Sequence, residues 1–313
     1  MHAGSYYHHT IDYYLHQVLP VLKSEAFDCV ILENRPGYAL QLQGVTKARL
    51  VYHLGNDFLN STTPAAAEIY SAAAGIVTVS DFIKSRVQTC HPADTKCVTV
   101  HNGIDLTPFS RPPQVTRASL GYDDDDFILA FSGRLIPEKG ILELVEAMNL
   151  LRQESRIKLL VMGASFYDNT TDDTPFIAEL KARSRDLGDR IRFTGYVQHD
   201  RMPDYLRLSD VAVIPSTWEE PFGLTVVEGM AAGLPVIVSD RGGIPEIVTP
   251  HNAIVVPLAA DFPRQLSQTI LSLFRNPEAR QRMGSHSLQL AARFSKDIYA
   301  QSFFSAIDSF CGA

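Results

Sequence analysis

Short apolar runs alternate with longer helical patterns along the whole of this 313-residue chain, and this alternation constrains its fold most strongly. Most of the runs are continuous stretches of Val, Ile and Leu, as in strands that are buried on both faces of a parallel sheet. Strands separated by helices of about 9 to 18 residues predict an α/β architecture with right-handed crossovers. The predicted strands are 29–32, 50–54, 76–79, 98–101, 127–132, 158–162, 191–194, 211–215, 235–239 and 253–256.

A break in this alternation lies at residues 106–126. Residues 106–115 are rich in proline and residues 123–126 are consecutive aspartates, so neither stretch can form a central strand. Together they are typical of an inter-domain linker that is followed by a surface turn. The aspartate run could also hold a metal ion, but a solvated loop is the better interpretation.

We therefore expect two domains. The second, at residues 126–294, holds six strands with their helices and forms a complete doubly wound domain after a linker at 111–125. The first, at residues 1–110, has four strands and opens on a helix-like aromatic segment, so we expect it to be incomplete. A C-terminal helix at residues 295–313 is predicted to pack back toward the first domain.

Composition excludes some classes of function. A net charge of −7 argues against non-specific binding to nucleic acid, which requires clustered Lys and Arg. No apolar run approaches the ~20 residues of a membrane span, and the N-terminus lacks the pattern of a signal peptide. We therefore expect a cytoplasmic protein. The cysteines have no metal-like spacing and indicate free thiols in a reducing compartment; they are Cys29, Cys90, Cys97 and Cys311.

Two cations follow the strand at residues 127–132. Arg134 lies in the loop after the strand, and Lys139 lies where the next helix is predicted to begin. Ligands of open α/β sheets bind beyond the carboxyl ends of the strands, which is where both cations are expected. A Lys at a helix start is unfavourable unless an anion shares the site. The pair therefore predicts a phosphate site, although a surface Arg and a solvated Lys remain the structural alternative.

Two acids follow the strand at residues 211–215. Glu220 lies in the loop, close to the only Trp of the chain, at the predicted carboxyl edge of the sheet. A carboxylate in that place can accept hydrogen bonds from sugar hydroxyls, so Glu220 is a functional candidate. Glu228 has a structural explanation, because Thr225 and Glu228 have the spacing of a helix capping box.

Glycines and histidines supply further candidates. Gly242 and Gly243 precede a predicted helix that begins near Pro245, an arrangement that suits an anion or a plain turn. In the first domain, His53 and His101 lie near or just past the carboxyl ends of predicted strands. Each is either a structural histidine or a residue that faces a cleft.

Several of these segments, taken in order, resemble the retaining glycosyltransferases of family 4, which have the GT-B fold of two Rossmann-like domains facing a cleft. The resemblance rests on residues 133–140, on Phe-Thr-Gly-Tyr-Val at 193–197, on the Glu220-x7-Glu228 pair and on residues 242–246. Val79-Ser80 and 101–105 match upstream. Glu33-Asn-Arg-Pro36 is similar to a sequence of a bacterial surface-polysaccharide and spore-coat branch.

The resemblance implies a role for each candidate. Arg134 and Lys139 would neutralise the diphosphate of a nucleotide-sugar donor, Glu220 would hold the sugar, and Glu228 would bind the ribose. The backbone at Val197 would line the base pocket. The catalytic residues expected are Glu220, Arg134, Lys139 and His53; the expected donor-binding residues are Gly133, Val197, Ser216, Pro221, Phe222, Gly223, Leu224, Thr225 and Glu228.

The resemblance also implies partners. The donor is expected to be a nucleotide-diphosphate sugar, UDP-linked by preference, with no metal and no other cofactor. The acceptor is a glycan or a lipid-linked or protein-linked glycoconjugate, and contact with the inner face of a membrane is left open. Relatives open with a strand and a glycine-rich loop that have no counterpart before Tyr6, which predicts a truncated N-terminal domain. The cleft histidine is His53, or in another register its place is taken by Gly55.

Alternative functions are distinguished by simple observations. A catalytically inactive nucleotide-sugar-binding or scaffolding protein would bind nucleotide without turnover. A phosphorylase would need a cofactor lysine for which no signature is found, and an epimerase is disfavoured by the loop that joins Glu220 to Glu228. The leading hypothesis is an active transferase that retains the anomeric configuration.

Overall fold

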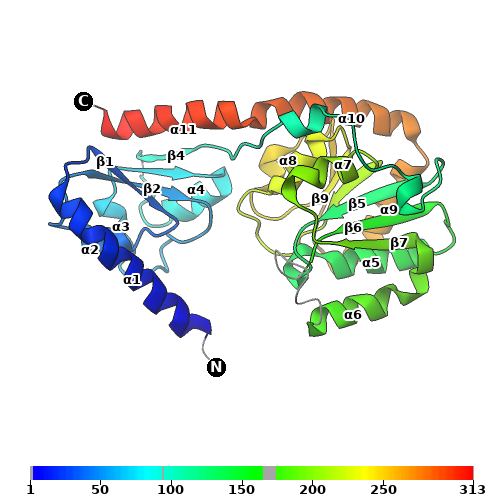
Figure 1. Ribbon diagram of the computed structural model, residues 1–313, viewed down its shortest axis with the longest axis horizontal. Coiled ribbons are helices and arrows are strands. Elements are labelled where there is room, and N and C mark those ends of the chain that lie inside the picture. Colours follow the sequence, from blue (N-terminus) through cyan, green and yellow to red (C-terminus); the bar gives the residue numbers. More distant parts are fainter. Residues whose placement is uncertain (1–2, 94, 165–173, 313) are drawn as a thin grey trace. The chain divides into compact units, whose positions relative to one another are not determined.

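The computed structural model describes residues 3–93, 95–164 and 174–312 of the chain (Figure 1). They form two compact units, each with its own sheet. The first unit comprises residues 1–101 together with residues 300–313, and the second comprises residues 102–299. Each unit is described by itself below.

The first unit is built on four parallel strands in the order β1-β2-β3-β4. The strands are β1 (Cys29–Glu33), β2 (Arg49–Leu54), β3 (Gly75–Thr78) and β4 (Cys97–Thr99). The helices are α1 (Ala3–Ser24), α2 (Tyr38–Leu42), α3 (Ala66–Ala72) and α4 (Asp81–Gln88). The start of α4 is fixed by Ser80, whose hydroxyl accepts a hydrogen bond from the amide of Ile83.

The end of the C-terminal helix α11 (Lys296–Cys311) packs on this first sheet. Arg49 Nη1 donates a hydrogen bond of 2.7 Å to the backbone carbonyl of Phe310. The ring of Phe310 fills the space over Gly75, where a Cβ atom would lie 2.1 Å from the ring. The absence of a side chain at Gly75 therefore leaves room for the aromatic ring at the amino end of β3.

The second unit contains six parallel strands in the order β10-β9-β8-β5-β6-β7. The strands are β5 (Phe127–Ser132), β6 (Ile157–Met162), β7 (Ile191–Gly195), β8 (Val211–Ile214), β9 (Val236–Ser239) and β10 (Ala253–Val256). The chain runs outward from β5 to β7 and then returns to the other side of β5. The strand order therefore reverses between β5 and β8, which makes the carboxyl ends of these two strands a topological switch point.

Helices and short 3-10 turns connect the strands of the second unit. The helices are α5 (Ile141–Leu150), α6 (Pro175–Ser184), α7 (Met202–Leu206), α8 (Leu224–Ala231), α9 (Phe262–Phe274) and α10 (Pro277–Ala291). The 3-10 turns are η1 (Thr107–Ser110), η2 (Ala118–Leu120), η3 (Pro137–Lys139), η5 (Arg185–Arg190), η6 (His199–Arg201), η7 (Ile244–Ile247) and η8 (Ala292–Phe294).

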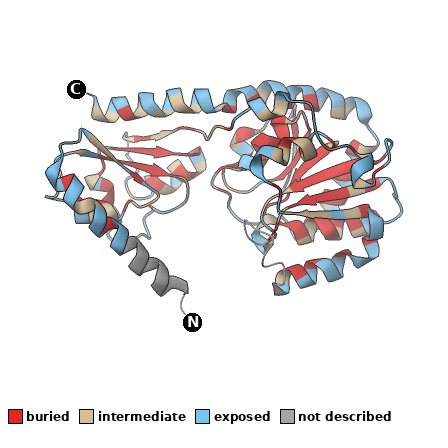
Figure 2. Cartoon of the chain, in the orientation of Figure 1, coloured by how far each residue is buried: buried red, intermediate tan, exposed pale blue. Residues whose placement is uncertain are grey.

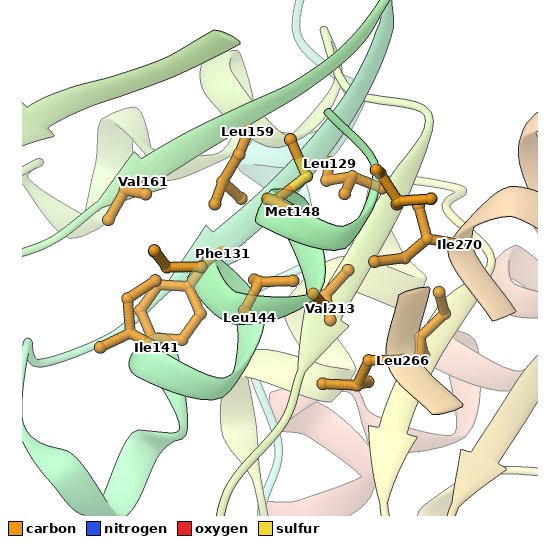
Figure 3. Packing of buried hydrophobic residues seen from close by; sticks show 14 of the residues in the cluster. Leu129, Phe131, Ile141, Leu144, Met148, Leu159, Val161, Val213, Leu266 and Ile270 are labelled. Atoms are coloured by element: carbon orange, nitrogen blue, oxygen red, sulfur yellow. The ribbon is translucent and has the colours of Figure 1, made fainter. Parts of the chain in front are cut away.

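The core of the second unit lies between this sheet and the helices α5 and α9. The central strands are almost wholly buried (Figure 2). Leu129 and Phe131 of β5 pack there against Leu144 and Met148 of α5, and Ile270 of α9 completes the cluster (Figure 3). Full burial of an aliphatic or aromatic side chain contributes about 1.5–3 kcal/mol, so this cluster holds the β5 scaffold rigidly in place.

The observed strands agree with the predicted ones. Each predicted strand has a counterpart whose ends differ by no more than two residues. The fold class of two parallel, Rossmann-like α/β domains is therefore confirmed. Nowhere in the described ranges is a helix both long enough and apolar enough to cross a membrane. Those ranges also hold no group of three or more His, Cys, Asp or Glu side chains arranged to bind a metal ion.

Candidate functional site

Three loops meet at the carboxyl edge of the second sheet. They follow the adjacent strands β5, β8 and β9, and we name them the cation loop (residues 133–140), the acid loop (215–223) and the glycine loop (240–243). Because neighbouring parallel strands end at the same edge, loops that are about 80 residues apart in sequence come together at the switch point.

The cation loop and the acid loop are in direct backbone contact. The amide of Thr217 donates to the carbonyl of Glu138 at 2.9 Å. Gly140 has a φ of +70° and lies so close to Pro215 that a Cβ atom would be 1.8 Å from the Pro215 carbonyl oxygen. A glycine is required here both for its conformation and for its lack of a side chain.

Glu220 is the centre of the acid loop. Its side chain is buried, and its Oε1 atom accepts hydrogen bonds from Lys139 Nζ at 2.5 Å and from Ser216 Oγ at 2.7 Å. The Lys139 ammonium also lies 5.6 Å from the centre of the Trp218 ring. A buried carboxylate is tolerated only when it is paired and hydrogen-bonded, and Lys139 with Ser216 meets both needs.

The glycine loop holds the backbone of Glu220. The amide of Gly243 donates to the Glu220 carbonyl at 2.7 Å, and the amide of Gly242 donates to Glu219 Oε2 at 2.6 Å. Arg241 Nη1 donates to the other oxygen of Glu219 at 3.1 Å. The carboxylate of Glu219 thus bridges the acid loop and the glycine loop.

These contacts change the interpretation of Gly242 and Gly243. Their amides are used by the protein itself, and the turn that follows, η7, has four residues in 3-10 conformation. The predicted position near Pro245 is confirmed, but the element there is this 3-10 turn and not the predicted helix. An anion site at a helix N-terminus is not confirmed, because so short a turn lacks an α-helical dipole.

Arg134 differs from Lys139 in its surroundings. It is exposed at the end of β5, and within the described ranges its side chain makes no hydrogen bond or ion pair. The preceding Gly133 has a φ of +146°, and a Cβ atom at Gly163 would lie 1.9 Å from its carbonyl oxygen. The missing side chain of Gly163 lets the ends of β5 and β6 approach closely, whereas Gly133 is required for its positive φ. The guanidinium group of Arg134 remains available to a ligand.

Glu228 does not form the predicted capping box. Helix α8 begins at Leu224, and its N-cap is Gly223, which has a φ of +106° and no side chain to bond the first turn. Thr225 lies inside the helix. The prediction is wrong because the glycine starts the helix at Leu224 and places Glu228 beyond its first turn.

The side chain of Glu228 is instead buried in the interior of α8. Burial raises the pKa of its carboxyl group to about 7, well above the ordinary value of 4.5. The exposed His199 of η6 lies 3.5 Å away, measured from Nδ1 to Oε1. A buried carboxyl group with a raised pKa that does not cap its helix is typical of a functional site.

The other predicted donor-binding residues differ in how far they are buried. Phe222 is buried and packs edge-on against Phe294, with 6.0 Å between ring centres, so it anchors the acid loop in the core. Leu224 is exposed at the start of α8. The remaining residues are buried or half-buried in the acid loop, in the first turn of α8 or after β7; they are Ser216, Pro221, Gly223, Thr225 and Val197.

His53 lies in the first unit, near the carboxyl end of β2. Its Nδ1 atom is 2.5 Å from Glu33 Oε2, and the two residues face each other in the register of β1 and β2. Its ring also contacts the ring of Phe303 edge-on at 5.0 Å. The next residue, Asn34, donates a hydrogen bond of 2.9 Å from its Nδ2 atom to the other carboxylate oxygen of Glu33, Oε1.

Sequence reasoning missed Glu219, Arg241 and His199. Glu219 was visible only as one of two adjacent acids, and Arg241 only as a cation beside two glycines. Their pairing joins loops that follow different strands, and no local pattern encodes it. The order of the strands could have suggested it, because β8 and β9 are neighbours.

Two Rossmann-like sheets, with charged loops gathered at the switch point of the second, define a protein of the GT-B class. Residues 114–289 match the family described as glycosyl transferases group 1. The match covers more than half of the chain and includes all three loops. The chain belongs to this family.

Relatives of known name support the assignment. The spore coat protein SA of Bacillus subtilis is 29% identical over 297 residues, which are 90% of this chain and 78% of that protein. The lipopolysaccharide 1,2-N-acetylglucosaminetransferase of Salmonella typhimurium is 32% identical over 203 residues, 64% of this chain and 51% of that enzyme.

Solved structures share the fold. The Anabaena protein Alr3699/HepE, crystallised with UDP and glucose, superposes with a TM-score of 0.79 at 20% identity over 94% of this chain and 81% of that one. A glycosyltransferase from Rickettsia africae superposes with a TM-score of 0.81 at 19% identity over 95% and 80% of the two chains.

Proposed function

We propose that this protein transfers a sugar from a nucleotide-diphosphate sugar to a glycan or glycoconjugate acceptor, with retention of the anomeric configuration. The observation that carries the proposal is the cluster of Lys139, Ser216 and the buried Glu220 at the switch point, with Arg134 exposed in the same loop as Lys139. Cations for a diphosphate and a carboxylate for sugar hydroxyls are thus gathered at the edge where open α/β sheets bind ligands.

The diphosphate is assigned to the two cations and to the start of α8. Arg134 offers a planar fork of donors for phosphate oxygens, and Lys139 adds a mobile point charge. The first amides of α8, at Leu224 and Thr225, have no partner within the helix and point toward its N-terminal side. Each well-placed donor stabilises the leaving diphosphate by about 3 kcal/mol in the transition state.

These groups do the work that a divalent metal does in other phosphate sites. We therefore propose that the enzyme needs no metal and no further cofactor. Retention is assigned to attack of the acceptor hydroxyl on the face from which the diphosphate leaves, with a phosphate oxygen taking the proton of that hydroxyl. Such a step needs no protein nucleophile.

The sugar and the nucleoside are assigned to carboxylates on either side of the diphosphate. Glu220 accepts hydrogen bonds from hydroxyls of the donor sugar. Glu228 accepts from the ribose hydroxyls, and the backbone at Val197 lines the base pocket. UDP is the preferred nucleotide, supported by the UDP complex of the Anabaena protein, which shares this fold.

The acceptor is proposed to be a glycan or a lipid-linked or protein-linked glycoconjugate of a bacterial polysaccharide pathway. The similarity to the Salmonella lipopolysaccharide enzyme and to the spore coat protein supports a surface glycan. We propose a cytoplasmic location, with the acceptor presented at the inner face of the membrane. His53 and Glu33 of the first unit are assigned to the acceptor side.

The experiment is a turnover assay with a panel of UDP-, GDP- and ADP-sugars, in which transfer or slow hydrolysis is followed by release of nucleotide. Glu220→Ala and Lys139→Ala are expected to abolish turnover. Lys158→Ala is the matched control, because Lys158 also pairs with a carboxylate, that of Asp189 at 3.0 Å, but lies near the amino end of β6. Unchanged turnover in both site variants would refute the assignment.

A second outcome separates an enzyme from a binding protein. Calorimetry that shows tight binding of UDP by the wild-type chain, without turnover of any donor in the panel, would identify a nucleotide-sugar-binding or scaffolding protein. Turnover with an inverted anomeric configuration, determined by proton NMR of the product, would refute the retaining mechanism alone.

A further inference from the structure

We propose that Glu220 holds Lys139 in an ion pair in the ligand-free protein, and that the donor diphosphate binds by taking Lys139 away from it. This inference rests on the proposed function, because it assigns an order of events to the same site. It predicts that the carboxylate needed for the donor sugar opposes binding of the nucleotide itself.

The contacts at Glu220 place the competition on one oxygen atom. Lys139 Nζ at 2.5 Å and Ser216 Oγ at 2.7 Å both donate to Oε1. Only 21% of the Lys139 side chain and 7% of the Glu220 side chain are exposed, so solvent screens this pair weakly. A phosphate oxygen that approaches Lys139 therefore meets a carboxylate that already holds the ammonium group.

The surrounding contacts decide which partner moves. Glu220 is held by the Ser216 hydroxyl on its side chain and by the Gly243 amide on its backbone. The glycine loop lies close against it, since a Cβ atom at Gly242 would be 2.0 Å from the Glu220 carbonyl oxygen. Lys139 ends a flexible four-carbon stem, so the ammonium group turns and the carboxylate remains in place.

The exchange couples the two halves of the donor. When Lys139 turns to the diphosphate, Glu220 loses one of its two donors, and a buried carboxylate that lacks a donor is costly. A hydroxyl of the attached sugar supplies the missing hydrogen bond. The sugar is therefore recognised only together with its diphosphate. Glu220 thereby distinguishes the intact donor from a free sugar.

The test compares UDP affinities by calorimetry. Glu220→Gln keeps the size of the side chain and an oxygen that can accept from Ser216, but it removes the competing charge. This variant is expected to bind UDP about tenfold more tightly than the wild type, because a weakly screened negative charge that competes with the phosphates is lost. Glu220→Ala is expected to act in the same direction and serves if the Gln variant does not fold.

A double-mutant cycle separates exchange from simple repulsion. In a Lys139→Met background no ammonium group is left to compete for, so the gain from Glu220→Gln is expected to fall to about threefold or less. Asp189→Asn is the matched control. It removes a carboxylate that pairs with Lys158 near the amino end of β6, away from the carboxyl edge of the sheet, and should leave UDP affinity unchanged.

The outcomes are distinct. Equal gains from Glu220→Gln in the wild-type and Lys139→Met backgrounds, or an unchanged or weaker affinity of Glu220→Gln for UDP, would overturn the exchange while leaving the proposed function intact. If neither the wild type nor Glu220→Gln binds UDP or any other nucleoside diphosphate, the proposed function fails, and the exchange fails with it.

Discussion

Gly140 and Pro215 join the two loops that carry the charged residues of the site. The Gly140 backbone has a φ of +70° and lies against the Pro215 carbonyl oxygen, leaving no room for a side chain. The contact connects the end of the cation loop to the end of β8. The distance between Lys139 and Glu220 thus depends on a position that itself carries no functional group.

Gly140→Ala is therefore expected to destabilise the protein and to impair turnover. A left-handed conformation for a residue other than glycine costs about 1–3 kcal/mol, and the overlap with Pro215 adds to that cost. Urea denaturation measures the loss of stability. Gly44→Ala is the control, because Gly44 has a φ of +74° but nothing within 4 Å of an added Cβ atom, so only the conformational cost of about 1–3 kcal/mol applies.

Glu219 is expected to control the rate of transfer rather than nucleotide affinity. Its carboxylate ties the acid loop to Gly242 and Arg241, so Glu219→Ala should loosen the backbone that presents Glu220. We expect kcat to fall about tenfold, consistent with a small misplacement of a group that contacts the substrate. The dissociation constant of UDP should change less than twofold.

Rescue by a conservative change checks this interpretation. Glu219→Gln keeps one of the two accepting oxygens and should recover part of the rate that Glu219→Ala loses. A Glu219→Ala variant that binds UDP much more weakly, at unchanged kcat, would place Glu219 in nucleotide binding instead.

Arg134 is expected to contribute to function at no cost in stability. Because its side chain is exposed and unpaired within the described ranges, Arg134→Ala should leave the free energy of unfolding within about 0.5 kcal/mol of the wild type. We expect kcat/KM to fall by about 100-fold, since a bidentate contact with the diphosphate is lost. Arg134→Lys should recover little of it.

A steady-state assay with the exposed Arg185→Ala as control tests this prediction. If Arg134→Ala and Arg185→Ala have equal kcat/KM values, Arg134 is a surface residue of no functional importance.

The Glu228 carboxyl group predicts a specific pH dependence of stability. Its pKa is raised from 4.5 to about 7 by burial, so the folded state holds this proton more firmly than the unfolded state. The stabilisation is fully present below pH 4.5 and is lost as pH rises to about 7. The pKa shift corresponds to about 3 kcal/mol over this window.

Glu228→Gln removes this dependence and keeps the size of the side chain. The difference in unfolding free energy between the variant and the wild type should therefore grow from pH 5 to pH 7 and then remain constant. Urea denaturation at several pH values measures it. A difference that is independent of pH would show that Glu228 is not titrating in this range.

Much of the fold was accessible from the sequence. The continuous apolar runs of β5 and β8 were predicted because strands that are buried on both faces leave that pattern. Because Arg134, Lys139 and Glu220 follow these two strands, they were predicted to lie at the carboxyl edge of the sheet. Residues that directly follow a parallel strand can be placed without knowledge of any side-chain contact.

The contacts within the site were not accessible. The ion pair of Lys139 with Glu220 depends on β5 and β8 being neighbours, and the strand order is not a local property of either segment. The capping box at Thr225 failed for a local reason, because Gly223 starts the helix and Glu228 becomes an interior residue. Capping patterns specify a helix start only when the N-cap residue has a side chain that can cap.

A crystal structure of the complex with UDP would test the location of the donor site most directly. The predicted result is a diphosphate within hydrogen-bonding distance of both the Arg134 guanidinium and the Lys139 ammonium, with Lys139 withdrawn from Glu220 and Glu228 at the ribose. A diphosphate bound elsewhere on the chain, with the Lys139–Glu220 pair intact, would contradict it.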